Sequence, residues 1–219
     1  WFILRQLKLK EPILEFRVFK NPIFTLSTIL GMLVFVAMIG AAVIFPLLMQ
    51  NMLGFTAFES GLMLLPGAIL MGVMNPITGR LFDKFGARWL AIIGLSILTV
   101  TTFMLTNMST ETSFAYLAAV NAVRMFTIAM VMMPVTTAGL NQLSKHMIPH
   151  GSAMNNTMRQ VAGAVGTALL VTVMTTNYIP DEGVQGMIHG VNVSFLVAGI
   201  FALIGLVLSF FIKSSRPKV

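Results

Sequence analysis

The sequence predicts an all-α membrane protein whose chain crosses the bilayer six times. Charged residues make up only 10% of its 219 residues, against about 25% in ordinary soluble domains, and the mean hydropathy is +0.89. Six tracts almost free of charge follow one another, and most reach the ~20 residues that cross a ~30 Å hydrocarbon core. They cover residues 23–54, 62–79, 89–108, 114–143, 161–178 and 191–212.

Four prolines lie within the predicted helices. Pro46 falls in the first segment, Pro66 and Pro76 in the second, and Pro134 in the fourth. Because proline leaves a carbonyl without its helical donor, we expect a kink at each, where neighbours or a polar cavity satisfy the backbone. Ser60, just before the second segment, is the expected N-cap. The third and sixth segments contain no proline.

The fifth segment begins polar and continues as a ladder of small residues. Ala162 and Gly166 are four residues apart, as are Gly163 and Thr167 on the neighbouring stripe. Small residues at this spacing let two helix backbones approach closely in lipid, so we expect a tight helix pair here. Tight packing does not account for the polar residues that precede the ladder, which are Asn155, Asn156, Arg159 and Gln160.

The chain divides into a linker (1–22), a six-helix bundle (23–213) and a cytoplasmic tail (214–219). Residues 5–22 mix basic and apolar positions, so the linker either lies along the membrane interface or is a solvated connector. The first ten residues, WFILRQLKLK, read like the end of an apolar segment that runs into a basic loop. We therefore expect that the chain is part of a longer protein and that another helix precedes the linker.

The basic residues gather in alternate connections. Lys and Arg precede the first segment, lie between the second and third and between the fourth and fifth, and end the chain, whereas the other connections contain none. Because short loops rich in Lys and Arg stay cytoplasmic, we expect a cytoplasmic (inner) membrane protein with both ends of this chain on the cytoplasmic side. The net charge of +7 then serves topology, and we expect no nucleic-acid partner.

Two arginines lie within predicted helices. Arg124 is near the middle of the fourth, with Asn121 three positions earlier on the same face. An ionisable group there costs roughly 2.5 to 3.5 kcal/mol on insertion. Arg124 is thus either a functional group of a polar cavity or a structural cation satisfied by Asn121, carbonyls or water. Arg159 is near the cytoplasmic end of the fifth helix, where its side chain either lines the cavity or extends to the interface.

Further polar residues complete the candidate site. Asn75 precedes Pro76, and it either lines the cavity or satisfies the backbone that the proline frees. Met132 belongs to a cluster of methionines, whose flexible thioethers suit ligands of varied shape but are also ordinary lipid-facing filler. The candidate substrate and cavity residues are Asn75, Asn121, Arg124, Met132, Asn155, Asn156, Arg159 and Gln160.

Motifs of catalysis and metal binding are missing from the sequence. It contains no Cys and no H-E-x-x-H, G-x-S-x-G or P-loop pattern, so we expect no enzyme activity, no catalytic residue and no cofactor. His146 and His150 are four residues apart, but no Cys or carboxylate lies beside them. Chance accounts better for this spacing than a metal site does.

Residues 61–88, GLMLLPGAILMGVMNPITGRLFDKFGAR, resemble the eighth helix and following loop of a major facilitator transporter. The loop is similar to the G-x-L-a-D-r-x-G-r-k signature of that superfamily, from which Phe82 and Ala87 depart. The segments PHGSAMNNTMRQVAGAVGTALL, MMPVTTAGLNQL and PILEFRVFKNP narrow the resemblance to drug:proton antiporters of the fourteen-helix EmrB/QacA kind. The matching signature residues are Gly79, Leu81, Asp83, Lys84, Gly86 and Arg88.

The resemblance implies the C-terminal half of a transporter, with six helices in two inverted three-helix repeats. Its first, second, fourth and fifth helices would line a central cavity, while the third and sixth would face lipid. The complete protein would exchange entering protons for exported amphiphilic, often cationic, compounds, using the proton gradient as its energy source. Its partners would be the lipid bilayer and its own N-terminal half, which would also hold the proton-carrying carboxylates.

The charged stretch between the second and third segments has two interpretations. Its basic residues keep a short turn on the cytoplasmic side. The resemblance adds a gating role, in which Gly86 bends the backbone and Asp83 pairs with an Arg or with backbone N–H groups to lock one state of the transport cycle. The expected gating motif is Gly79, Arg80, Asp83, Lys84, Gly86 and Arg88.

Two other functions stay open at the level of sequence. The same scaffold could export one dedicated metabolite or lipid precursor, because a fold does not settle its cargo. It could also be a membrane scaffold or sensor that keeps the fold without transporting anything. Flux measurements on the complete protein distinguish these functions.

Overall fold

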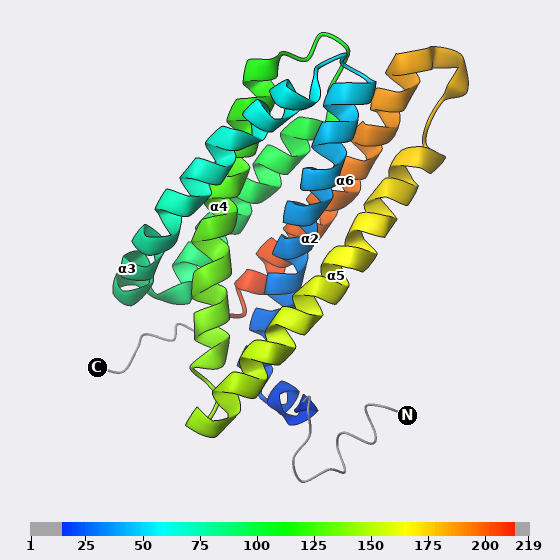
Figure 1. Ribbon diagram of the computed structural model, residues 1–219. Coiled ribbons are helices and arrows are strands. Elements are labelled where there is room, and N and C mark those ends of the chain that lie inside the picture. Colours follow the sequence, from blue (N-terminus) through cyan, green and yellow to red (C-terminus); the bar gives the residue numbers. More distant parts are fainter. Residues whose placement is uncertain (1–14, 213–219) are drawn as a thin grey trace.

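The computed structural model describes residues 15–212, which form one bundle of helices packed side by side (Figure 1). The all-α membrane fold predicted from the sequence is confirmed. Short 3-10 turns connect or precede the long helices: η1 (Phe16–Lys20), η2 (Met104–Thr106), η3 (Lys145–Met147) and η4 (Pro180–Glu182). The long helices are α2 (Pro22–Asn51), α3 (Ala57–Phe103), α4 (Phe114–Leu140), α5 (Ile148–Thr176) and α6 (Gly183–Ser209).

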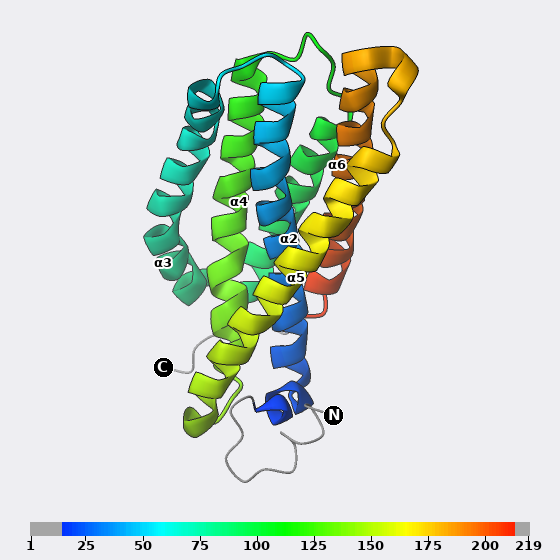
Figure 2. The ribbon, with the colours of Figure 1, turned by 45° about the vertical axis from the view of Figure 1, so that its right-hand side comes forward.

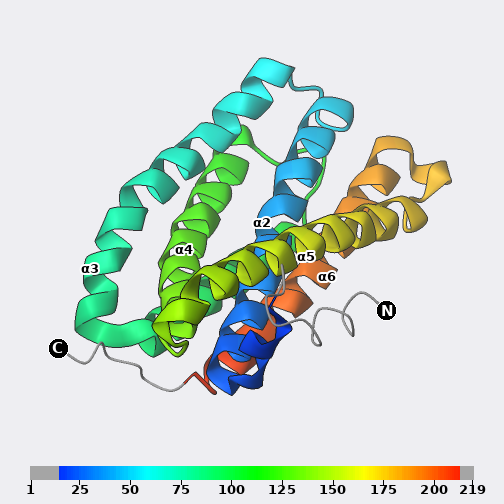
Figure 3. The same cartoon turned by 60° about the horizontal axis from the view of Figure 1, so that its bottom comes forward.

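Five helices are long and apolar enough to cross a membrane, and α3 is long enough to cross twice. Its 47 residues would measure about 70 Å as a straight helix, against a hydrocarbon core of ~30 Å. The helix is broken at Gly86, whose φ of 76° and ψ of 172° are not helical, and the chain turns back there (Figure 3). Residues 57–85 and 87–103 are therefore two legs, and together with the other four helices they form the six predicted crossings.

The structure corrects the predicted boundaries around α3. Residues 80–85, which we expected in a loop, are helical. Thr56, not Ser60, is the N-cap, because the Glu59 N–H donates to Thr56 Oγ1 over 3.2 Å and the Thr56 N–H donates to Glu59 Oε2 over 2.8 Å. This reciprocal capping box satisfies two main-chain N–H groups at once. Ser60 lies in the first turn of the helix, where its hydroxyl donates to the main-chain oxygen of Thr56.

The four prolines lie inside helices as predicted, but none of them interrupts the helical backbone. Pro46 is within α2, Pro66 and Pro76 are within the first leg of α3, and Pro134 is within α4. The kinks expected at the prolines stay a prediction, and the reversal of α3 occurs at Gly86, where the backbone has a positive φ. A glycine with no side chain permits this reversal, whereas proline only removes one hydrogen bond from a continuing helix.

The connections lie at two opposite ends of the bundle (Figures 1 and 2). The turn at Gly86, the α4–α5 connection and η1 share one end, which we call the basic end because Arg80, Lys84, Arg88 and Lys145 are exposed there. The other end joins α2 to α3, α3 to α4 and α5 to α6, and its connections contain no Lys or Arg. The structure thus separates the connections as the charge pattern predicts.

The end of the linker packs against the bundle. Val18 in η1 is 1% exposed and forms a small apolar cluster with Phe24 of α2 and Met154 of α5. Asn21 then caps α2 by accepting hydrogen bonds from the main-chain N–H of Ile23 and Phe24. Residues 15–21 are therefore not a free solvated connector. Residues 1–14 of the linker, and Lys213 with the predicted tail, lie outside the described residues.

The small residues of α5 make a close pair with α2. A Cβ atom added to Gly166 would lie 2.5 Å from Val36, and one added to Gly163 would lie 2.8 Å from the ring of Phe35. Both distances are shorter than real carbon contacts allow, so the two helices approach only because glycine occupies these positions. The tight helix pair predicted from the ladder in the fifth segment is confirmed.

Candidate functional site

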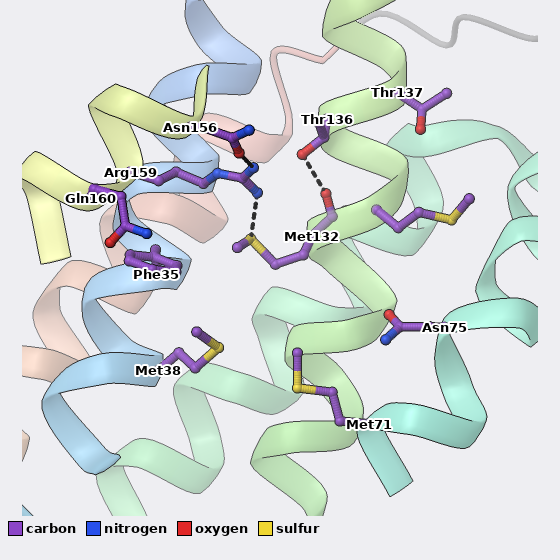
Figure 4. A pocket seen from close by; sticks show the side chains of 11 residues that line it. Phe35, Met38, Met71, Asn75, Met132, Thr136, Thr137, Asn156, Arg159 and Gln160 are labelled. Carbon is purple, nitrogen blue, oxygen red and sulfur yellow. Dashed lines mark hydrogen bonds between the residues drawn. The ribbon is translucent and has the colours of Figure 1, made fainter. Parts of the chain in front are cut away.

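A cavity of about 440 Å³ lies between α2, the first leg of α3, α4 and α5 (Figure 4). These are the four segments for which we expected a place along the cavity, and α6 and the second leg of α3 supply none of its lining. The lining residues are Phe35, Met38, Met71, Asn75, Met132, Met133, Thr136, Thr137, Asn156, Arg159 and Gln160.

Five of the eight candidates chosen from the sequence line this cavity: Asn75, Met132, Asn156, Arg159 and Gln160. Met133 belongs to the methionine cluster noted in the sequence but was not among the candidates. The five other lining residues, Phe35, Met38, Met71, Thr136 and Thr137, were not singled out. Helical spacing was the available signal. Met71 is four residues before Asn75 and Thr136 four residues after Met132, so each shares a face with a predicted polar residue.

Among the described residues that line the cavity, Arg159 is the one with a charged side chain. Its side chain extends from α5 towards α4 (Figure 4), where Nη1 donates to the thioether sulfur of Met132 over 3.9 Å and Nη2 donates to Asn156 Oδ1. The guanidinium group is partly buried and is held between two helices. The sequence allowed the Arg159 side chain either to line the cavity or to extend to the membrane interface. In the structure it lines the cavity.

Polar and apolar groups occupy different parts of the lining. Arg159, Asn156 and Gln160 gather on α5, and Thr136 of α4 donates a hydrogen bond to the main-chain oxygen of Met132 over 2.7 Å. Phe35, Met38 and Met71 form an apolar part below the polar group in Figure 4. No carboxylate lines the cavity among residues 15–212. Such a lining suits an amphiphilic molecule whose polar part accepts hydrogen bonds.

A second hollow of about 560 Å³ adjoins the first along α5. Phe35 and Gln160 line both, and the second continues past Gly163 and Thr167. Because the α5 residues there are small, the groove runs close to the helix backbone. The two hollows together provide a long, shallow surface instead of an enclosed pocket.

The chain is similar to known membrane proteins over most of its length. Residues 4–167 match the family model described as Major Facilitator Superfamily. The chain belongs to that superfamily. It is 51% identical over 99% of its length to the uncharacterized MFS-type transporter YcnB of Bacillus subtilis. It is 40% identical over 98% of its length to the lincomycin resistance protein LmrB of Listeria monocytogenes, and 28% identical over 75% of its length to the multidrug export protein EmrB of Escherichia coli.

The chain spans about half the length of two of these relatives, namely 47% of YcnB and 48% of LmrB. Membership of a transporter superfamily agrees with the six crossings and makes the cavity, not a catalytic centre, the site of interest.

Arg124 of this major facilitator chain lies away from the cavity and is 0% exposed. Its Nε donates to Thr102 Oγ1 over 3.3 Å, and its Nη2 donates to the main-chain oxygen of Ala37 over 3.2 Å. The guanidinium carbon is 6.0 Å and 5.7 Å from the ring centroids of Phe45 and Phe195, within reach of cation–π attraction. Nη1 has no hydrogen-bond partner among the described residues. Arg124 thus joins α2, the second leg of α3, α4 and α6.

Asn121 and Asn155 are also buried and do not line the cavity. Asn121 makes no hydrogen bond to Arg124, although both lie on one face of α4. Its amide faces the first leg of α3, where a Cβ on Gly67 would lie 2.9 Å from Asn121 Nδ2. Neither amide has a hydrogen-bond partner among residues 15–212. Buried amides without partners are costly, so these two are places where a water molecule or a change of conformation would supply the missing bonds.

The predicted gating motif lies at the basic end, around the turn of α3. Gly86 makes the backbone bend that we expected. Asp83, Lys84 and Arg88 are exposed, and Asp83 forms no hydrogen bond or ion pair with any described residue. Asp83 therefore has no partner among residues 15–212, and the gating role stays a prediction.

Proposed function

We propose that this chain is the C-terminal half of a proton-coupled exporter of amphiphilic toxic compounds, working by alternating access in the cytoplasmic membrane. The observation that carries the proposal is the cavity between α2, α3, α4 and α5, which combines thioethers and an aromatic ring with amide, hydroxyl and guanidinium donors. The names of LmrB and EmrB, a lincomycin resistance and a multidrug export protein, support export as its purpose.

In this proposal Arg159 binds a polar group of the cargo. A guanidinium held by Asn156 and Met132 is preorganised to donate to a carbonyl, hydroxyl or anionic oxygen. The flexible side chains of Met38, Met71 and Met132 adapt to apolar parts of different shapes. This half then contributes hydrogen-bond donors and apolar surface, and any carboxylate that binds cationic cargo comes from the N-terminal half.

The proton step also belongs to the complete transporter. Apart from the two ends of the bundle, residues 22–209 contain no Asp or Glu, so no carboxylate of this chain is placed to carry a proton across the core. We propose that the N-terminal half supplies that carboxylate and that the basic end of the bundle faces the cytoplasm. The proton gradient supplies the energy, and no organic or metal cofactor is involved.

Export assays with the complete transporter test the proposal. In cells that lack their own pumps, the intact protein should protect against several dyes and antibiotics, and in vesicles it should move them only when a pH gradient is imposed. Arg159→Gln should raise the KM for oxygen-rich cargo about tenfold, because a hydrogen bond to a charged group contributes about 1.5 kcal/mol or more. Lys145→Gln removes the same charge from the exposed α4–α5 connection and should change nothing.

The assays also separate the other two functions. Protection against one compound alone would favour a dedicated exporter of a metabolite or lipid precursor. Absence of any flux driven by a pH gradient, in vesicles that contain correctly folded protein, would favour a scaffold or sensor. An Arg159→Gln variant with unchanged KM for every cargo would remove Arg159 from the binding site while leaving export itself intact.

A further inference from the structure

The turn of α3 carries an apolar groove on its outer surface, separate from the cavity. Five residues line it, two from the first leg and three from the second: Leu81, Phe85, Trp89, Leu90 and Ile93. The groove encloses about 500 Å³, and none of its lining side chains is polar. Because the helix reverses at Gly86, side chains from the two legs converge on one hollow, which a straight helix could not form.

The groove is open to its surroundings in this bundle. Trp89 is 59% exposed, Ile93 is 49% exposed and Phe85 is 45% exposed. Large apolar side chains exposed together mark a surface that contacts lipid or another apolar partner. The groove is distinct from the cavity, because the two share no lining residue.

Positive charge surrounds the same turn. Arg80, Lys84 and Arg88 are all exposed, and none forms a hydrogen bond or ion pair with a described residue. The ammonium group of Lys84 is 5.3 Å from the ring centroid of Phe85, so one cation lies directly at the rim of the groove. Asp83 is the one acidic residue in residues 80–93, which leaves a net positive patch.

An apolar groove with cations at its rim matches one kind of molecule. A phospholipid acyl chain fills an apolar groove, and a headgroup phosphate is attracted by Lys and Arg near the membrane surface by ~1 kcal/mol for each residue. Trp89 fits this depth, because tryptophan favours the boundary between hydrocarbon and headgroups. Retaining the turn in the cytoplasm requires the charges but does not require a groove beside them.

We propose that the turn of α3 is a binding site for one anionic phospholipid. Its acyl chain lies in the groove against Phe85, Trp89 and Ile93, and its phosphate lies beside Lys84 and Arg88. A zwitterionic phospholipid fits the groove equally well but gains less from the net positive patch. The site is independent of the cargo, and it is expected to be present in the complete protein whether or not that protein exports drugs.

Fluorescence of Trp89 provides the test. The complete transporter is placed in phosphatidylcholine bilayers that contain a brominated lipid. This lipid is either brominated phosphatidylglycerol or brominated phosphatidylcholine, at the same mole fraction. The Trp89 signal is the difference between the parent protein and Trp89→Phe. We expect brominated phosphatidylglycerol to quench this signal at a several-fold lower mole fraction than brominated phosphatidylcholine does.

Charge variants complete the test. Lys84→Gln combined with Arg88→Gln should bring quenching by phosphatidylglycerol to the level of phosphatidylcholine, whereas Lys145→Gln at the same end of the bundle should keep the preference. Circular dichroism and a single symmetric peak on size exclusion confirm that each variant is folded. Equal quenching by the two lipids in the parent protein would overturn the proposal. Absence of quenching by either lipid would also overturn it, because it would show that protein covers the groove.

Discussion

Arg124 Nη2 donates a hydrogen bond to the main-chain oxygen of Ala37 over 3.2 Å. This bond joins the centre of α4 to the centre of α2, 87 residues earlier in the chain, inside a core where Arg124 is 0% exposed. The oxygen it binds is a carbonyl of a helix, so the guanidinium group has no compensating negative charge within the described residues. A buried cation of this kind is retained at a cost in stability.

Two substitutions of Arg124 distinguish its role in packing from its role in transport. Arg124→Met keeps most of the side-chain volume and removes the charge, so we expect its thermal midpoint to stay within a few degrees of the parent. Arg124→Ala leaves a void as well, and it should be less stable than the Met variant by about 2 kcal/mol. In both variants we expect reduced transport at normal membrane abundance. Full transport by Arg124→Met would assign Arg124 a structural role only.

Gly86 should accept no other residue. Its φ of 76° and ψ of 172° lie in a region essentially restricted to glycine, so Gly86→Ala should cost about 1–3 kcal/mol of stability. Gly86→Asn should be no better than Ala, because asparagine favours the left-handed helical region, which has a different ψ. Thermal unfolding of the purified transporter measures both.

Gly72 is the matched control for Gly86. It is also in α3, but a Cβ added there meets no atom within 4 Å. Gly72→Ala should therefore leave the thermal midpoint unchanged or raise it slightly, since alanine favours helix. A loss at Gly72 equal to that at Gly86 would show that the positive φ is not the cause.

The contact between α2 and α5 should depend on Gly166. A Cβ at this position would lie 2.5 Å from Val36, so Gly166→Ala should destabilise the protein by roughly 1–3 kcal/mol through overpacking. Val36→Ala removes the atoms that clash. The double variant should recover part of the loss, and a double-mutant cycle on thermal unfolding would detect this coupling. If the effects of the two substitutions on the free energy of unfolding simply add, Gly166 and Val36 do not form the close contact.

Asp83 should act across the two halves of the transporter. Because it is exposed and has no partner among the described residues, Asp83→Asn should leave thermal stability within about 0.5 kcal/mol of the parent. We expect the balance of inward-facing and outward-facing forms to change, which distance measurements between spin labels on the two halves would detect. An unchanged balance would reduce the charged stretch to an anchor for topology.

Composition and charge pattern predicted the architecture because they indicate directly which segments lie in lipid and which lie in water. Long apolar tracts identify the crossings, and the positions of Arg80, Lys84 and Arg88 identify the end to which their turn belongs. The boundaries were less predictable. Residues 80–85 are polar enough to resemble a loop, yet they stay helical because one glycine makes the whole reversal. Hydropathy cannot distinguish a polar turn of helix from a loop.

The site was predictable where polar residues interrupt an apolar helix. Asn156, Arg159 and Gln160 stand out in α5 and line the cavity. Arg124 stands out equally in α4 but faces another direction, because the sequence gives its position along the helix and not which neighbours surround it. Phe35 and Met38 line the cavity with side chains that also suit lipid, so no property of the sequence marks them.

The turn at Gly86 also bears on how the chain enters the membrane during synthesis. A loop between two crossings carries polar backbone that has to remain in water while its two helices insert. Here a single residue separates the legs of α3, so very little backbone at the turn lies outside helix. The second and third crossings are thus suited to insert together as one hairpin, with Arg80, Lys84 and Arg88 left on the side from which it enters.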